Sequence, residues 1–132
     1  MLSSKKIQKI ICEYGRKIDA PLSMLPTIIP KSLSDGTYFD TDGCYRLIVA
    51  ERGKILKQYQ YQTIKDFLYR VFFRVTFEMA VLGEVGKRID TEDSRKMIFK
   101  LQRNWMEQVD SDFLPQYDEE IAQLLREYPY KT

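Results

Sequence analysis

Apolar and polar residues follow helical spacing at both ends of the chain and strand spacing in between. In residues 4–18, isoleucines and a tyrosine recur every three or four positions, and lysines and an arginine fill the positions between them. This pattern predicts a first helix with one buried face. Residues 19–35 contain three prolines, which fit poorly in a helix interior or a central strand. We predict that this segment is a structured loop.

Period-two alternation marks the next part of the chain. It occurs in residues 37–40, in "YRLIVAERG" from residue 45, and in "ILKQYQYQ" from residue 55. Asp42-Gly43 between the first two stretches is a strong signal for a tight hairpin turn, and Arg52-Gly53 between the last two is a weaker one. The three stretches therefore predict an antiparallel meander of three strands.

Helical spacing returns after the meander. Thr63 and Asp66 have the spacing of a capping box, and the helix predicted for residues 64–82 is apolar around most of its circumference. Such a helix is expected to lie between the sheet and other helices. A further helix with an acidic first turn is predicted for residues 91–109, and a last helix follows Asp112 and Pro115 and ends before Pro129. The expected fold class is α+β: an N-terminal helix, a three-stranded antiparallel meander, then three helices packed on it, in a single domain of residues 1–132.

The composition is that of a packed globular protein, with 44% apolar and 13% aromatic residues. The formal net charge of +2 does not by itself indicate nucleic acid or an acidic membrane as a partner. The charge is uneven, because residues 1–31 carry +4 and residues 105–132 carry −5. Cys12 and Cys44 are interpreted as free thiols in a reducing cytoplasm. No apolar run is long enough for a signal peptide or a membrane span.

The chain has no histidine, which removes the commonest general base and most zinc-site patterns. No glycine-rich phosphate loop is present either, so we expect no catalytic residue, no metal site and no cofactor. Glu51 keeps two interpretations open. By alternation it points toward the body at the sheet edge, where a half-buried carboxylate could act as an acid. Alternatively, it forms an ion pair that closes the hairpin, for example with Arg88 or Arg95.

Two surfaces are candidates for binding a macromolecule. Basic side chains on the first helix, together with Tyr59 and Tyr61 on the sheet, would suit nucleic acid, although no RNA-binding signature is present. An acidic segment near the C-terminus would suit a basic protein partner, or would simply be a solvated face. The candidate partner-binding residues in this segment are Asp110, Asp112, Asp118 and Glu119.

Taken in order, five segments resemble the immunity protein 63 family of bacterial polymorphic toxin systems, over about residues 44–130. They are "YRLIVAERGK", "LYRVFFRVTFEMA", "GEVGKRID", "DSRKMIFKLQ", with the pattern Asp-x-Arg-x-x-x-Phe-x-x-Gln, and "EEIAQLLREYPY". Two features depart from the pattern: Phe113 stands where a tryptophan is expected, and the chain ends in Lys131-Thr132 where acidic residues are usual. The structural signature residues that the resemblance points to are Glu51, Arg52, Gly53, Glu84, Arg88, Asp93 and Arg95.

The resemblance implies a protein without enzymatic activity. Such a protein sits in the bacterial cytoplasm and inhibits a cognate toxin domain stoichiometrically, as a monomer or weak dimer. Glu51 and Arg52 would then fix the hairpin against the helices, with Glu84, Arg88, Asp93 and Arg95 as their candidate partners. A nucleic-acid-binding or regulatory interaction module is the second interpretation, and a carboxylate-dependent enzyme is the third.

Overall fold

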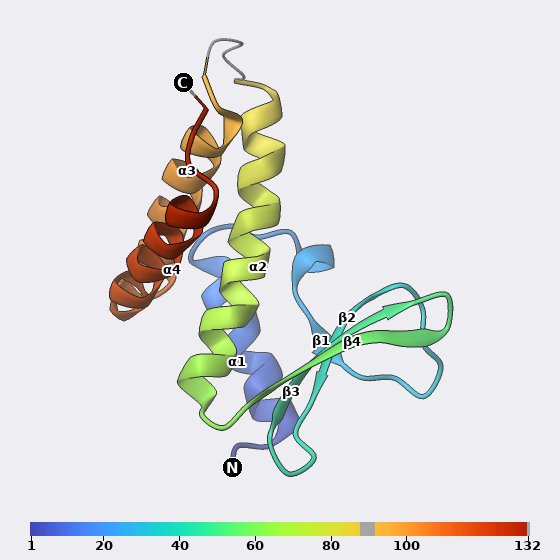
Figure 1. Ribbon diagram of the computed structural model, residues 1–132. Coiled ribbons are helices and arrows are strands. Elements are labelled where there is room, and N and C mark those ends of the chain that lie inside the picture. The colour runs from blue at the N-terminus through green and yellow to red at the C-terminus, as the bar shows by residue number, and fades with distance from the viewer. Residues whose placement is uncertain (88–91, 132) are drawn as a thin grey trace. The chain divides into compact units, whose positions relative to one another are not determined.

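A computed structural model describes residues 1–87 and 92–131 (Figure 1). The chain divides into two compact units, Met1–Val71 and Phe72–Thr132, which we call the N-terminal unit and the C-terminal unit. The predicted α+β class and the order of a helix, a sheet and three helices are confirmed. The organisation of residues 1–132 as a single domain stays a prediction.

The N-terminal unit contains a four-stranded sheet, where the sequence predicted three strands. The strands are β1 (Thr27–Ile28), β2 (Gly36–Asp40), β3 (Tyr45–Glu51) and β4 (Lys54–Tyr61), in the spatial order β1-β2-β3-β4. The antiparallel meander of β2, β3 and β4 is confirmed. The additional strand, β1, pairs parallel to β2 inside the proline-rich segment that was predicted to be a loop. Pro26 and Pro30 flank this edge strand. Proline has no N–H to donate to a sheet ladder, and it is tolerated at the start or edge of a sheet because no neighbouring strand needs that donor.

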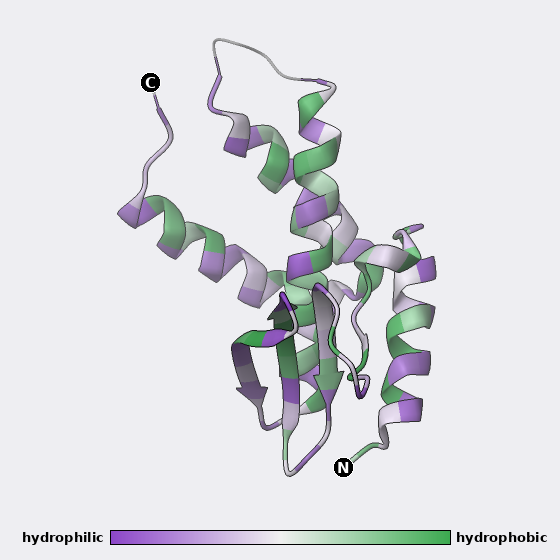
Figure 2. Cartoon of the chain, turned by 90° about the vertical axis from the view of Figure 1, so that its right-hand side faces the viewer, coloured by the Kyte–Doolittle hydropathy of each residue, from purple (hydrophilic) through white to green (hydrophobic). Residues whose placement is uncertain are grey.

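Helix α1 (Ser4–Arg16) begins at Ser3, whose side chain accepts a hydrogen bond from the Lys6 backbone N–H. It buries Ile7 and Ile11 on one face, and Figure 2 shows the corresponding alternation of hydrophilic and hydrophobic residues along this helix. The helix ends two residues before the predicted Ile18. The reason is local: Asp19 adopts a positive φ of 52°, which turns the chain out of the helix.

Both predicted hairpin connections form, but only the second is a tight two-residue turn, because Asp40 pairs with Arg46 across the first and Glu51 pairs with Lys54 across the second. Gly43 has a φ of 78° between β2 and β3, and Arg52 and Gly53 have φ values of 54° and 77° between β3 and β4. Positive φ at both central residues, as at Arg52 and Gly53, is the requirement of a type I′ two-residue turn. Arginine is unusual in this conformation, and the Arg52 backbone N–H is held by Asp35 Oδ1 at 2.7 Å.

The first turns of α2 (Ile64–Val85) complete the core of the N-terminal unit. Thr63 caps this helix, since its hydroxyl accepts from the Asp66 N–H at 3.1 Å. Phe67 is fully buried, and its ring centroid lies 5.8 Å from that of Phe39 and 5.9 Å from that of Tyr45. Edge-to-face and tilted aromatic pairs of this kind add to the burial of apolar area.

The C-terminal unit contains the rest of α2, helix α3 (Ser94–Val109) and helix α4 (Leu114–Glu127). A short 3₁₀ turn, Ser111–Phe113, precedes α4, and the N-terminal unit has another at Leu22–Met24. Helix α3 begins three residues later than predicted, because Asp93 is its N-cap. Ala80, Ile98 and Phe99 form a buried cluster on which Leu101 and Trp105 pack. At Gly83 an added Cβ would lie 3.2 Å from Leu101 Cδ1, so α2 and α3 approach closely there.

Helix α2 is longer than predicted and less completely buried. It continues to Val85, and Phe77, Leu82 and Val85 are exposed. A helix lying between the sheet and other helices was expected for residues 64–82, and Phe77 and Leu82 within that span are exposed. None of the three exposed residues belongs to the cluster around Ala80, so the apolar stripe of α2 is wider than the face that its neighbours cover.

Candidate functional site

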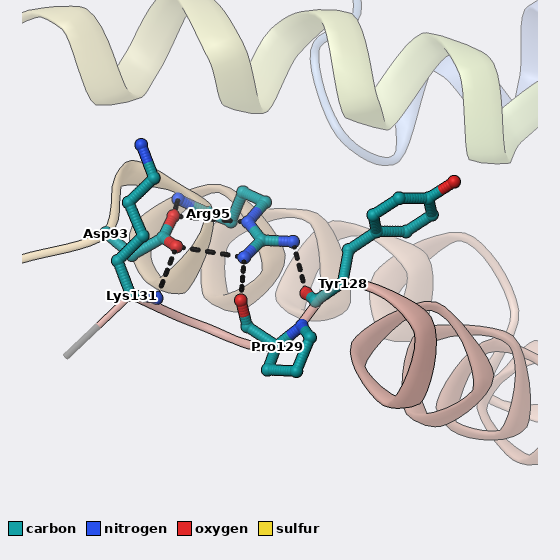
Figure 3. A network of polar contacts seen from close by, with 5 residues as sticks. All are labelled: Asp93, Arg95, Tyr128, Pro129 and Lys131. Atoms are coloured by element: carbon teal, nitrogen blue, oxygen red, sulfur yellow. Dashed lines mark hydrogen bonds and ion pairs between the residues drawn. The ribbon is translucent and has the colours of Figure 1, made fainter.

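Asp93 and Arg95, two of the signature residues, form a clamp that holds the end of the chain (Figure 3). The Asp93 carboxylate accepts hydrogen bonds from the Arg95 backbone N–H at 3.0 Å and from Arg95 Nη2 at 2.9 Å. It also accepts from the Lys131 backbone N–H at 3.0 Å. The Arg95 guanidinium in turn donates to the carbonyl oxygens of Tyr128 at 2.7 Å and Pro129 at 2.8 Å. Each residue thus contacts both α3 and the segment after α4.

Charge stabilises this clamp. Hydrogen bonding from the Arg95 side chain, followed by the backbone N–H groups of Lys131 and Arg95, holds the pKa of Asp93 well below its usual value. The same ion pair raises the pKa of Arg95. The guanidinium also lies over the Tyr130 ring at 5.4 Å from its centroid, a cation–π contact. The fork of arginine suits two carbonyls and a carboxylate at once, which explains why an arginine stands here.

Gln102 ends the Asp-x-Arg-x-x-x-Phe-x-x-Gln segment and is fully buried. Its Nε2 donates to the Phe73 carbonyl of α2 at 2.9 Å. The hydroxyl of Tyr117, from α4, lies 2.9 Å from Gln102 Oε1 and 3.2 Å from the Phe99 carbonyl. Burial raises the pKa of Tyr117, so its hydroxyl stays protonated and remains a donor. The Gln102 side chain therefore joins the three helices of the C-terminal unit.

Three further residues of the quoted segments, Thr76, Ala80 and Glu84, are also buried in the C-terminal unit. In the Thr-Phe-x-Met-Ala segment, Thr76 is buried and donates to the Phe72 carbonyl at 2.6 Å, and Ala80 lies in the apolar cluster. Glu84 is 2% exposed, a degree of burial that a carboxylate tolerates only with polar partners. Arg88 lies outside the described residues.

Glu51, Arg52 and Gly53 belong to the N-terminal unit and lie at the exposed tip of the β3–β4 hairpin. The expectation that Glu51 points toward the body is wrong, because its side chain is exposed. Glu51 is the last residue of β3 and stands directly before the hairpin turn, where no element of the N-terminal unit covers it. The pairing of Glu51 and Arg52 with Glu84, Arg88, Asp93 or Arg95 would join the two units and stays a prediction.

A family model described as Immunity protein 63 matches residues 41–123, more than half of the chain. The chain belongs to the immunity protein 63 family. The match includes the hairpin tip, Asp93, Arg95 and Gln102. The residues that Asp93 and Arg95 hold, from Tyr128 to Lys131, lie beyond it, as do residues 124–130 of the predicted resemblance. No curated protein and no solved structure matches the chain.

The four acidic candidates of this family member differ in how they are engaged. Asp110 accepts from the Asp112 backbone N–H at 2.9 Å and so caps the short turn before α4. Asp118 forms a bidentate ion pair with Arg103, at 2.8 and 2.9 Å, which lowers the pKa of Asp118. Glu119 lies 3.5 Å from the Arg126 guanidinium, and both side chains are exposed. Asp112 and Glu119 thus point their charge outward, while Asp110 and Asp118 also have a local structural role.

The features that suggested other functions are partly used in the packing of this protein. The ring of Tyr61 packs on Phe67 at 6.2 Å between centroids, and Tyr59 is half-buried, so these rings are not an open stacking platform. Within residues 1–87 and 92–131, no three His, Cys, Asp or Glu side chains come together as a metal site. None of the helices in the same residues combines the length and apolarity needed to cross a bilayer.

Sequence reasoning missed several residues that shape the protein. Gln102, Tyr117 and Asp35 were not among the predicted site residues, although Gln102 lies within a quoted segment. A signal for Gln102 was present, since it stands four residues after Ile98 on the apolar face of its helix. A polar residue on such a face indicates a buried hydrogen-bond network. Asp35 carried no comparable signal, because its contact with Arg52 depends on two neighbouring strands.

Proposed function

We propose that this protein is an immunity protein that binds a cognate toxin domain and neutralises it by stoichiometric inhibition in the bacterial cytoplasm. The observation that carries the proposal is the match of residues 41–123 to the Immunity protein 63 family model. Membership implies a toxin partner in general terms. The specific toxin, the one-to-one mechanism and the compartment are parts of the proposal.

The contacts of the signature residues support a binding protein without catalytic activity. Asp93, Arg95 and Gln102 are all engaged in hydrogen bonds within the C-terminal unit, so they maintain its shape and are not directed at a substrate. A stoichiometric inhibitor needs such a stable scaffold, together with exposed anchor residues and complementary charge. A catalytic protein would need reactive groups that are free to meet a substrate.

The acidic residues near the C-terminus are one part of the proposed contact surface. Asp112 and Glu119 are exposed, and Asp118 presents half of its side chain to solvent while bound to Arg103. Exposed carboxylates accelerate and orient association with a basic partner. We therefore propose that a toxin domain meeting this surface is basic, and that association with it weakens as the salt concentration rises.

Co-expression tests the proposed function. The toxin domain encoded beside this protein is expressed in a bacterial host with and without the immunity protein, and growth and co-purification are measured. We expect growth to be restored and the two proteins to purify as a complex. Double replacement of Asp112 and Glu119 by lysine should slow association without unfolding the protein. A matched replacement of exposed Glu13 and Glu78, which do not belong to the acidic segment of residues 110–119, is the control.

If the toxin inhibits growth equally with and without this protein, the proposed function is wrong. If protection is complete but no complex forms, stoichiometric inhibition is wrong even though immunity holds. The acidic contact surface is refuted separately when the lysine variant associates as fast as the wild-type protein at low salt.

A further inference from the structure

The two edges of the sheet differ in how their backbone groups are covered. Strand β1 has two residues, and Gln8 of α1 covers its outer side. Gln8 Nε2 donates to the Pro26 carbonyl at 3.1 Å, and Gln8 Oε1 accepts from the Ile28 N–H at 3.1 Å. This edge is short, and Gln8 covers its outward polar groups. A short edge strand and a covered edge are two of the ways in which proteins protect sheet edges.

The other edge, β4, is long and open. It has eight residues and pairs only with β3 in the described sheet. Within the part of the chain that the structure describes, no hydrogen bond outside the β3 ladder reaches the backbone of residues 54–60. A register shift leaves Leu56 without a partner on β3. In the rest of this edge strand, alternate residues direct their N–H and C=O groups away from the sheet. The β4 backbone is therefore a template for one more strand.

The side chains of β4 indicate what kind of strand fits. The strand carries Lys54 and Lys57 and no acidic residue, and Arg52 adds a third positive charge at the adjoining turn. Ile55 and Leu56 are apolar and 44% and 58% exposed. They line a shallow depression together with Glu51, Arg52 and Lys54. Opposite charges in facing positions stabilise a strand pair, and like charges destabilise it.

We propose that β4 is the docking edge for the toxin partner, which adds an extended segment to the sheet and places acidic side chains opposite Lys54 and Lys57. This inference rests on the proposed function and assigns it a contact surface on the N-terminal unit. A second copy of this chain is a poor occupant, because pairing two β4 strands would bring lysines together. Backbone pairing supplies affinity in such a complex, and the lysines and the exposed Ile55 and Leu56 select the partner's sequence.

Hydrogen exchange tests the backbone part of the inference. The probe is the inactivated toxin domain encoded beside this protein. We expect amides of residues 54–60 to exchange more slowly in the complex than in the free protein, because outward-pointing N–H groups become hydrogen-bonded. The amides of β1 should not change. If the complex forms and residues 54–60 exchange as in the free protein, strand addition at β4 is wrong.

Charge replacement tests the selectivity of the edge. The variant is Lys54→Gln/Lys57→Glu, in which glutamine is used at Lys54 because this residue faces Glu51 across the hairpin. The matched control is Lys5→Gln/Lys9→Glu on the exposed face of α1. Circular dichroism should show both variants folded. We expect the β4 variant to bind the toxin domain about tenfold more weakly or worse, and the control to bind like the wild-type protein.

The remaining outcomes separate the hypotheses. Equal binding of the β4 variant and the control contradicts the inference and leaves the proposed function intact. If the β4 variant binds more weakly but the amides of residues 54–60 are not protected from exchange in the wild-type complex, the partner contacts only the side chains of β4, and strand addition is contradicted. Protection that appears in the free protein as its concentration rises, together with a dimer in light scattering, assigns the edge to a second copy. If the wild-type protein does not bind the toxin domain, the inference and the proposed function fail together.

Discussion

Replacing Gln102 with methionine keeps most of the side-chain volume and removes both of its polar groups. The hydrogen bonds lost are those to the Phe73 carbonyl and from the Tyr117 hydroxyl, each 2.9 Å long. Two buried hydrogen bonds contribute about 1–3 kcal/mol together. The Tyr117 hydroxyl retains the Phe99 carbonyl at 3.2 Å as an acceptor, so the variant leaves no donor unpaired there.

The other single variant of a double-mutant cycle is Tyr117→Phe. It removes the hydroxyl and leaves Gln102 Oε1 without this donor in a fully buried position, which costs about 1–3 kcal/mol. Because both single changes break the same hydrogen bond, the double variant should be destabilised by about 1 kcal/mol less than the sum of the single effects.

The assay is urea unfolding followed by tryptophan fluorescence. Trp105 is the only tryptophan and packs on the apolar cluster of the C-terminal unit, so it reports on the unit in which the changes are made. Gln108→Met, an exposed position on the same helix, is the control and should change the free energy of unfolding by less than about 0.5 kcal/mol. If Gln102→Met behaves like this control, or if the single effects simply add, the network is not what joins the three helices.

Three further changes address the clamp, the hairpin and the aromatic core. The pKa of Asp93 is lowered from 3.8, so its contribution to stability is present above pH 3.8 and is lost as the pH falls below that value. In Asp93→Asn, urea midpoints should therefore depend less on pH in this acidic range than in the wild-type protein, and an unchanged dependence would contradict the clamp. Gly53→Ala should destabilise the protein by about 1 kcal/mol through its positive φ alone, because no atom lies within 4 Å of the added Cβ; an unaltered urea midpoint would argue against this turn. Phe67→Ala should lower the free energy of unfolding by about 3–5 kcal/mol, because it leaves a cavity among three rings. The unfolding curve followed by far-ultraviolet circular dichroism should shift to lower urea, and a decrease below about 1 kcal/mol would show that Phe67 is not central to the core.

The sequence predicted the elements that depend on local chemistry. The Asp42-Gly43 turn, the Thr63 cap and the apolar face of α1 each rest on a few neighbouring residues, and each is present. Strand β1 was missed because two residues between prolines carry no period-two signal, and their pairing with β2 depends on tertiary contacts. The register shift that leaves Leu56 of β4 without a partner on β3 was missed for the same reason, and the exposure of Glu51 depends on its place at the end of β3.

The candidate site was less accessible to sequence reasoning than the fold. The family pattern pointed to Asp93 and Arg95, but only the structure shows that they hold the carbonyls of Tyr128 and Pro129. A clamp between residues more than thirty positions apart has no local spacing that would reveal it. The predicted meander already implied that its third strand, β4, is an edge strand. That no other segment of the described residues bonds to the β4 backbone depends on tertiary structure and has no local signal.

The central proposal is that this protein protects by forming a stoichiometric complex with a toxin domain. The most direct measurement is a titration of purified toxin domain with this protein, in which residual toxin activity and the mass of the complex by light scattering are followed together. The account predicts that activity falls linearly to zero at an equimolar ratio and that one copy of each protein is present in the complex. Loss of toxin activity at a small fraction of an equivalent, or full activity in the presence of excess immunity protein, would contradict it.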